Sequence, residues 1–436
     1  NQSGNGWSKR FEIDFVPPPD LPAAHLTDLL GNGTRGLIWS SAPRRRNDSG
    51  YRYLDLCGGI KPYLLTEIDN GLGGITNITY TTSTAQKLTD DKNGRAWNSY
   101  LPFPVHVVKE IKQTDKASGR VGYTHFRYHQ GYYDSFGHEF RGFKEVEVKH
   151  DGDKSCPTII QKTTFNQGIH ASPLESHYMT DEQRAKQRAI AGSPSEIKTY
   201  ELTTNDEHIL RQSAVLKWDA RLEYSNSDHF VYFPHCIENE ARDHATGEYD
   251  RIDKAAYSYD KYGNLIRKLR TGRFANQQED EALYTDQQLT YTNNEIDWLV
   301  GLVASIEVRN KAGQLLNHTL NYYDGPNFVG LPLEQATKGI LRRTSELILA
   351  DWALPIGYEN EIDPSWKLEH KTEGYYHNVV SFEHDNFGNV ITSRDGLGND
   401  KTIKYDHENL FPTKMTDVDG LETLCEFNPR TAQPIM

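Results

Sequence analysis

Apolar and polar residues alternate along most of this 436-residue chain. The alternation is clearest in four segments: ITNITYTTST (75–84), PVHVVKEIKQT (104–114), THFRYHQGYY (124–133) and FKEVEVKH (143–150). A period of two places successive side chains on opposite faces of a strand, and Gly, Asn or Pro separates the segments as in turns. Similar segments return after residue 192. The pattern predicts a mainly β fold with long antiparallel strands in curled sheets.

One segment breaks the alternation and predicts a single short helix near 180–192, with the sequence TDEQRAKQRAIAG. Thr180 can cap its beginning, Asp181 and Glu182 suit the positive end of the helix dipole, and Gly192 suits its end. A second stretch, around residues 340–352, fits a helix or a pair of strands equally well.

Composition strengthens the β prediction. Tyrosine (25 residues) and glycine (34) are frequent, whereas methionine (3) is scarce. Tyrosine favours strands and glycine favours tight turns. The four cysteines, at positions 57, 156, 236 and 425, are far apart and form no CxxC pair, so we expect free thiols.

Charge and hydropathy narrow the class of protein. The net charge is −13, and no basic run is longer than Arg44–Arg46, so we expect no nucleic-acid partner. No apolar run approaches the roughly 18 residues of a membrane span. The first residues, NQSGNGWSKR, are neither a signal peptide nor a start methionine, so we expect a fragment of a longer protein.

The last eighty residues contain a repeat. Similar units are headed at positions 384, 405 and 427, which are 21 and 22 residues apart, and Gly398 and Gly420 keep the same spacing. A period near twenty residues predicts one strand-turn-strand unit per repeat, stacked so that neighbouring units cover each other. The segment 257–272 is an isolated copy of this unit.

These units resemble Rhs/YD repeats, in which a Tyr-Asp pair precedes a glycine turn. The matching phrases are YDKYGNL (259–265), HDNFGNV (384–390) and the degenerate YDHENLF (405–411). Longer stretches resemble the middle region of the B component (TcdB/TcaC-like) of bacterial insecticidal toxin complexes. They include YLDLCGGIKPYLLTEIDNGLGGITNITYTTST (53–84), GYYDSFGHEFRGFKEVEV (131–148) and YYDGPNFVGLPLEQATKGILRR (322–343), and they occur in the family's order.

The resemblance implies a non-enzymatic segment of an Rhs/YD-repeat shell that encloses a toxic passenger. It implies as partners the C component with its passenger toxin and the pore-forming A component. It implies no cofactor, and secretion within a toxin complex after a cytoplasmic stage. Four regions are expected: 1–50 as the end of a propeller-like region with a linker, 51–125 and 126–300 as first and second middle β regions, and 301–436 as the YD-repeat region.

We expect structural rather than catalytic roles for the motif residues. In HEFRGF (138–143) the phenylalanines are apolar anchors, the glycine allows a bend, and the arginine can pair with Glu139 or Asp134. Pairs such as Asp417 and Asp419 are expected to cap their own turns. The full set is Tyr133, Asp134, Phe140, Arg141, Gly142, Phe143, Tyr259, Asp260, Gly263, Gly388, Asp395, Gly398, Tyr405, Asp406 and Gly420.

Three motifs suggest ligands, each with a plainer alternative. GNGTRG (31–36) matches a dinucleotide-binding loop, but the residues after it do not favour the required helix. Asp28 and Asn32 are calcium candidates, although two side-chain oxygens suit a structural turn better. His235, Cys236 and Glu238 are candidates for a transition metal, although their spacing is more typical of a wet strand face.

An alternative function is a cell-surface adhesion or carbohydrate-binding β protein with YD repeats. In that case we expect exposed aromatic contact points around Trp97, Tyr132 and Tyr133. For the shell segment, open sheet edges predict that the isolated chain is oligomeric or poorly soluble.

Overall fold

The computed structural model describes residues 24–40, 51–168, 179–226, 229–244, 250–276, 278–354, 368–371 and 373–435. The predicted propeller-like region and linker therefore lie largely outside the described residues. The chain divides into two units. Unit 1 comprises Asn1–Arg211 with Asn226–Phe230, and unit 2 comprises Gln212–Ser225 with Val231–Met436. The division falls within the predicted 126–300 region, and the four predicted regions stay predictions.

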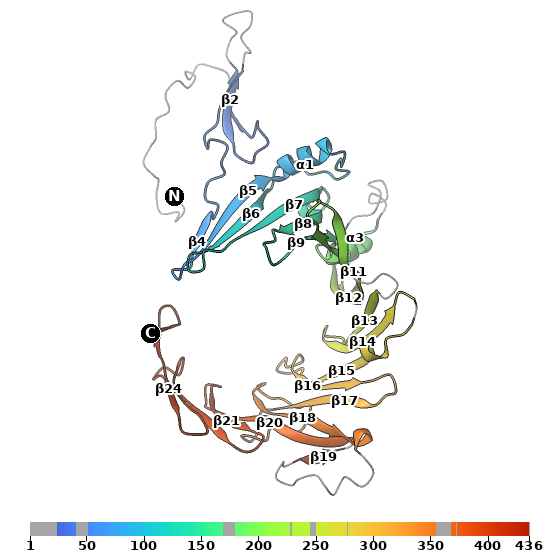
Figure 1. Cartoon of the computed structure of the whole chain (residues 1–436), viewed down its shortest axis with the longest axis vertical. Coiled ribbons are helices and arrows are strands. Elements are labelled where there is room, and N and C mark those ends of the chain that lie inside the picture. Colours follow the sequence, from blue (N-terminus) through green and yellow to red (C-terminus); the bar gives the residue numbers. More distant parts are fainter. Residues whose placement is uncertain are drawn as a thin grey trace, which may run out of the picture. The chain divides into compact units, whose positions relative to one another are not determined.

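Unit 1 begins with a three-stranded antiparallel sheet of β1 (His25–Thr27), β2 (Gly36–Ser40) and β3 (Tyr51–Leu54). A larger sheet follows, in which each strand pairs antiparallel with the next (Figure 1). Its strands are β4 (Glu67–Asp69), β5 (Gly74–Thr82), β6 (His106–Asp115), β7 (Val121–Asp134), β8 (Glu139–His150), β9 (Thr158–Phe165) and β10 (Pro194–Leu202). The strand β11 (His208–Ser225) crosses the division between the units.

Unit 2 contains a meander of its own, in which antiparallel strands form a bent sheet in Figure 1. The first strands are β12 (Phe230–Asp243), β13 (Arg251–Tyr259), β14 (Leu265–Phe274), β15 (Thr285–Tyr291), β16 (Val303–Arg309), β17 (Leu315–Tyr323) and β18 (Leu341–Ala350). The later strands are β19 (Glu369–Lys371), β20 (Gly374–His384), β21 (Val390–Asp395), β22 (Asp400–Tyr405), β23 (Pro412–Thr416) and β24 (Glu422–Leu424). A separate hairpin joins β25 (Glu426–Asn428) to β26 (Gln433–Ile435). Short 3-10 turns, η2 (Glu281–Leu283) and η3 (Asp351–Ala353), follow β14 and β18.

The predicted mainly β fold and the helix near 180–192 are confirmed. The helix α3 (Asp181–Ile190) begins with a capping box, in which Thr180 and Gln183 each bond the other's backbone N–H. Gly192 follows with a φ of 83°, the left-handed value that glycine tolerates best. The ambiguous stretch around 340–352 is the strand β18 followed by η3.

A second helix was not predicted. The helix α1 (Ser83–Lys92) begins where the alternating segment 75–84 ends, and it packs against β5 and β7. Thr82, the last residue of β5, caps it by accepting a hydrogen bond from the N–H of Ala85 at 3.2 Å. The local sequence has no acidic residue in the first turn and has a Thr-rich start, so the helix is stabilised mainly by its tertiary contacts.

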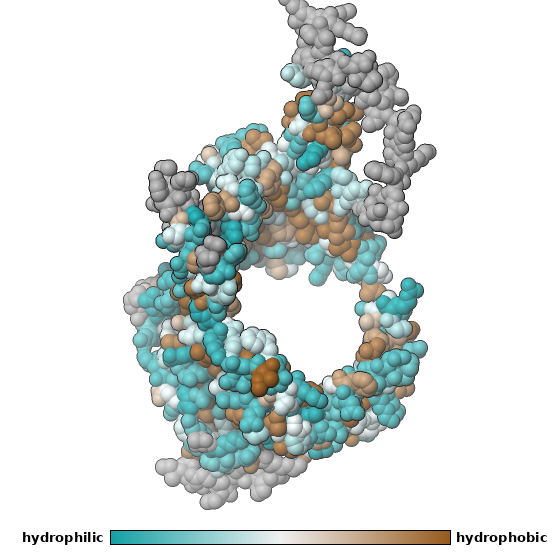
Figure 2. Space-filling view, turned by 180° about the vertical axis from the view of Figure 1, so that it is seen from behind, coloured by the Kyte–Doolittle hydropathy of each residue, from teal (hydrophilic) through white to brown (hydrophobic). Residues whose placement is uncertain are grey.

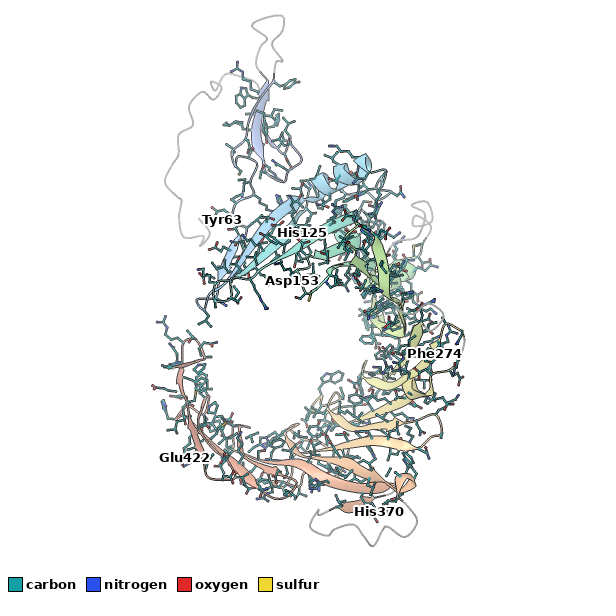
Figure 3. All side chains as sticks on the ribbon, viewed as in Figure 1. Tyr63, His125, Asp153, Phe274, His370 and Glu422 are labelled. Atoms are coloured by element: carbon teal, nitrogen blue, oxygen red, sulfur yellow. The ribbon has the colours of Figure 1, made fainter. Side chains whose placement is uncertain are left out.

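The sheets of both units are one layer thick in the part of the chain that the structure describes. Strands pack against their hydrogen-bonded neighbours, and side chains project from both faces (Figure 3). All nine positions of β10 and all five of β23 are half-buried, so in these two strands the alternation in sequence does not become a buried face and an exposed face. Figure 2 accordingly shows hydrophobic residues interspersed with hydrophilic ones over the visible face. A sheet of this kind lacks the second layer that closes the core of an ordinary domain.

Candidate functional site: Asp-centred turns and buried polar clusters

The YD phrase folds into a specific five-residue turn. At the end of β13, one carboxylate oxygen of Asp260 accepts the backbone N–H groups of Tyr262 (2.8 Å) and Asn264 (2.9 Å). The other oxygen accepts the Asn264 side-chain amide at 2.9 Å. Gly263 has a φ of 90°, which explains why glycine occupies this position. The Asp, Gly and Asn of the phrase therefore build one turn from local interactions.

The same turn recurs through unit 2. In each copy the side-chain oxygen of the first residue accepts a hydrogen bond from the backbone N–H four residues later. The backbone N–H of the first residue donates to the carbonyl at the far end of the turn. The further copies begin at Asn310, Asp385, Asp395, Asp406 and Asp417. Gly313, Gly388, Gly398 and Gly420 have φ between 78° and 94°. In the degenerate copy Asn409 replaces glycine with a φ of 56°, as asparagine tolerates this region. The predicted role of Asp417 as a cap of its own turn is thus confirmed, whereas the prediction for Asp419 is wrong, because its side chain makes no hydrogen bond within the described residues.

Asparagine side chains also link one turn to the next loop. The Asn264 amide, besides bonding Asp260, donates to the carbonyl of Val300 at 2.7 Å. The Asn389 amide donates to the carbonyl of Asn409 at 2.9 Å in the same way. Each such turn is therefore tied both internally and to the following hairpin on the same edge of the sheet.

The tyrosines at strand ends make the same kind of hydrogen bond. Four of their hydroxyl groups donate to a backbone carbonyl of the preceding strand: Tyr259 to Cys236 (3.0 Å), Tyr291 to Leu265 (2.9 Å), Tyr323 to Val303 (2.9 Å) and Tyr405 to Val390 (3.3 Å). A register shift of the strand pairing lies at each of these tyrosines. Burial raises the pKa of all four phenols, so they remain donors at neutral pH. The tyrosine of the repeat thus joins neighbouring strands.

We expect Tyr259→Phe to lower the free energy of unfolding of the chain by about 1 kcal/mol, because the ring stays and one hydrogen bond is lost. Urea unfolding followed by circular dichroism measures the change. Tyr375→Phe is the matched control, since Tyr375 is half-buried and its hydroxyl makes no hydrogen bond within the described residues. Equal effects of the two substitutions would contradict the assigned role.

One Asp in unit 2 organises a whole loop. Asp324, 4% exposed, follows β17 and accepts four backbone N–H groups from the segment before β18. The donors are Thr337 (2.6 Å), Lys338 (2.9 Å), Gly339 (3.0 Å) and Ile340 (3.0 Å). Burial by itself raises the pKa of Asp324, but the four donors outweigh it and the net direction is downward. The charged carboxylate therefore holds the 325–340 loop against the sheet.

A buried polar cluster in unit 1 joins α1 to β7. One Asp90 carboxylate oxygen accepts the indole N–H of Trp97 at 2.6 Å and lies 2.6 Å from Nδ1 of His129. These three residues are between 4% and 9% exposed. Trp97 also meets Phe143 edge to face at 6.2 Å. The cluster ties the end of α1 to the middle of the sheet.

The motif 133–143 is a hairpin between β7 and β8. Arg141 is buried, and its guanidinium contacts both carboxylates expected from the sequence, Asp134 at 2.9 Å and Glu139 at 3.2 Å. Gly142 has a φ of 77°, which provides the expected bend. Phe140 and Phe143 pack edge to face at 5.5 Å, and Tyr133 pairs with Phe140 across the hairpin.

The calcium candidates form a turn. The two carboxylate oxygens of Asp28 accept the N–H groups of Asn32 (3.1 Å) and Gly33 (2.7 Å), and the Asn32 oxygen accepts that of Thr34 at 3.0 Å. The side-chain oxygens of Asp28 and Asn32 thus accept backbone N–H groups, as expected for a structural turn. The strand β2, not a helix, follows the GNGTRG segment.

The transition-metal candidates lie on β12 with protein partners of their own. Glu238 is held between Lys217 at 2.6 Å and Lys254 at 2.7 Å, and these two hydrogen bonds lower its pKa. Nδ1 of His235 lies 3.2 Å from the carbonyl of Phe233, and the Cys236 thiol donates to the carbonyl of Glu238 at 3.4 Å. Within the described ranges, no group of three or more His, Cys, Asp or Glu is placed to hold a metal ion.

The expectation that Trp97, Tyr132 and Tyr133 form exposed aromatic contact points is wrong. Trp97 is 9% exposed and belongs to the core of unit 1, and Tyr132 and Tyr133 are half-buried. The sequence could not reveal this, because the partners that bury Trp97 come from α1 and β8. Asp90, His129 and Asp324 were missed for the same reason. For Asp324 a signal was present, since it follows Tyr323 as a Tyr-Asp pair.

Comparison with known proteins supports this description. Residues 17–168 match a family model described as the insecticide toxin TcdB middle/N-terminal region. The resemblance to the middle region of a TcdB-like B component, expected from the sequence motifs, is thus confirmed. No curated protein matches the chain.

Solved structures share the fold along the whole chain. The crystal structure of TcdB2-TccC3-Cdc42 matches with a TM-score of 0.70 and 18% identity, over 100% of this chain and 27% of that chain. The crystal structure of TcdB2-TccC3 matches with a TM-score of 0.68 and 17% identity, over 95% of this chain and 26% of that chain. The structure of the Photorhabdus luminescens Tc holotoxin pore matches with a TM-score of 0.68 and 18% identity, over 100% of this chain and 26% of that chain. The chain therefore spans about a quarter of the length of the chains it matches.

Proposed function

We propose that this chain is a structural, non-enzymatic part of the wall of a hollow shell that encloses a toxic passenger. The observation that carries the proposal is the one-layered sheet, closed at its turns by repeated Asp-centred hydrogen bonds. A sheet one layer thick can form a wall between two compartments. The half-buried faces suit a wall that is wetted or loosely contacted on both sides.

The polar clusters support a structural role. Asp90, Asp260 and Asp324 each use their oxygens to fix backbone or side chains of the same unit. The match to TcdB2-TccC3 structures supports a C component as the partner that completes the shell, with its passenger inside. The match to a holotoxin pore supports docking to a pore-forming A component, within an extracellular toxin complex. None of the helices in the described ranges is long and apolar enough to cross a membrane.

Co-expression of the tagged full chain with a TccC-type C component tests the proposal. We expect the two to co-purify and to form hollow particles in electron microscopy. A C component that stays unbound, beside a chain that is a clean monomer by light scattering, would overturn the shell assignment. Catalytic turnover that is abolished by Glu238→Ala or Asp134→Ala would overturn the non-enzymatic part.

A further inference from the structure

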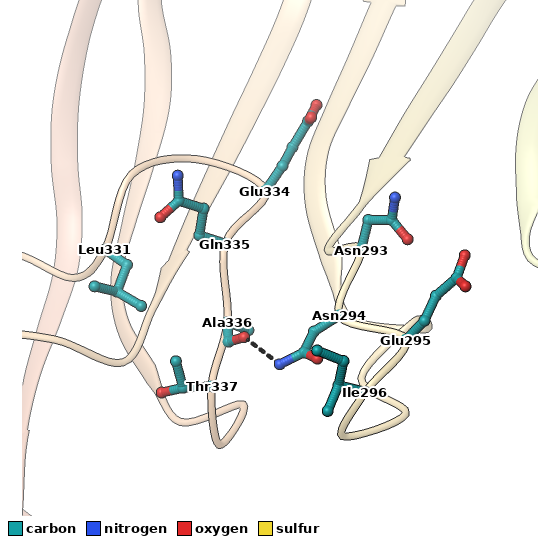
Figure 4. A pocket seen from close by; sticks show the side chains of 9 residues that line it. All are labelled: Asn293, Asn294, Glu295, Ile296, Leu331, Glu334, Gln335, Ala336 and Thr337. Atoms are coloured by element: carbon teal, nitrogen blue, oxygen red, sulfur yellow. Dashed lines mark hydrogen bonds between the residues drawn. The ribbon is translucent and has the colours of Figure 1, made fainter.

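Two loops at one edge of the unit 2 sheet enclose an open pocket of about 500 Å³ (Figure 4). One wall is 293–296, which follows β15. The other is Leu331 with 334–337, from the loop between β17 and β18. We propose that this pocket binds a neutral, hydroxyl-rich ligand of one or two sugar rings. Its volume lies in the range of small-molecule sites.

The walls of the pocket are fixed before any ligand arrives. The Asn294 amide donates to the carbonyl of Ala336 at 2.9 Å, which joins the two loops (Figure 4). The oxygen of the same side chain accepts the N–H of Asp297 at 3.1 Å. Asp324 holds the second wall from behind through Thr337. A ligand therefore meets a preformed surface, which reduces the entropy lost on binding.

Polar groups on the walls are available to a ligand. Asn293, Glu334 and Gln335 are exposed, and within the described residues their side chains make no hydrogen bond. Figure 4 shows Asn293 and Glu334 projecting to the same open side. Amides offer donors and acceptors together, and a carboxylate offers acceptors, which is the combination that neighbouring hydroxyl groups of a sugar require.

Apolar surface accompanies these groups. Ile296 lines the pocket and is 96% exposed, and Trp298 in the same loop is 71% exposed. Trp298 meets Tyr262 edge to face at 5.8 Å and is not among the residues that line the pocket, so the apolar surface offered to a sugar ring is that of Ile296. Trp298 and Glu334 have φ of 57° and 67°, left-handed values that are uncommon for such side chains and that concentrate at binding loops.

Charge argues for a neutral ligand. Glu295, the second carboxylate of the pocket, already accepts from Lys261 at 2.6 Å and from the Tyr262 hydroxyl. Glu334 alone supplies too few oxygen ligands to hold a metal ion. The unpaired carboxylate of Glu334 therefore disfavours a phosphate or another anion.

Saturation-transfer NMR on the full chain tests the inference. The probes are the methyl glycosides of glucose, galactose, mannose and N-acetylglucosamine, each at up to about 50 mM, because single-sugar affinities near the millimolar range are expected. We expect transfer to at least one probe. The double variant Asn293→Ala/Glu334→Ala should weaken it at least tenfold, and Ile296→Ala roughly two- to tenfold.

The matched control is Asn386→Ala/Glu408→Ala, which removes an exposed amide and an exposed carboxylate from other turns and should leave binding unchanged. Absence of transfer from all four probes would overturn the inference. Transfer that persists in the Asn293/Glu334 variant would also overturn it, and unchanged affinity in Ile296→Ala would overturn the role of the apolar surface. Each of these outcomes leaves the shell assignment intact, because that rests on the sheet and its turns.

Discussion

Replacing Asp324 with Ala is expected to destabilise unit 2 more than any other single change in its turns, by about 3–5 kcal/mol. The reason is that four backbone N–H groups lose their acceptor at once, and each buried donor left unsatisfied costs about 1–3 kcal/mol, with incomplete additivity. Hydrogen exchange should show fast exchange of the amides of 337–340, together with a lower urea midpoint. Asp419→Ala is the matched control, because that side chain is exposed on a turn and makes no hydrogen bond within the described residues. A loss below about 1 kcal/mol for Asp324→Ala would contradict this account.

The same carboxylate predicts a pH dependence. The folded pKa of Asp324 lies below its ordinary value, so the folded protein favours the charged form. Its contribution to stability is therefore complete above the unfolded pKa of about 3.9 and is lost as the pH falls through the folded pKa. Asp324→Asn should lack this component of the acid dependence, which a comparison of unfolding curves between about pH 2.5 and pH 6 would reveal.

Asp90→Ala is expected to destabilise unit 1 by about 3–5 kcal/mol. The substitution removes the shared acceptor of two buried donors, the Trp97 indole and His129, and leaves a cavity between α1 and β7. Thermal unfolding with tryptophan fluorescence as the readout measures the effect, and the Trp97 emission should shift to the red as its surroundings become wet.

The neighbouring residue provides the control for this prediction. Asp91 is also on α1, but it makes only an exposed ion pair with Lys87, four residues earlier. Asp91→Ala should cost no more than about 0.5 kcal/mol. If both substitutions had the same small effect, the buried cluster would not be what holds α1 in place.

Local interactions explain what the sequence predicted well. The Asp260 turn needs only residues 260–264, so the phrase itself carries its geometry, and the capping box of α3 needs only Thr180 and Gln183. Tertiary interactions explain what was missed. The helix α1 and the burial of Trp97 depend on Asp90 meeting His129, thirty-nine residues away. The sugar pocket likewise combines Asn294 with Ala336, forty-two residues away, which no local pattern reveals.

The asparagine links have a consequence for how such a sheet evolves. Each turn of the repeat closes on itself, and two of the turns also reach the next loop through a single amide, Asn264 with Val300 and Asn389 with Asn409. A duplicated unit of this kind brings its own turn and its own link, so it can be inserted between two others without redesigning either. The number of strands in the sheet would then change by gene duplication, in steps of one repeat.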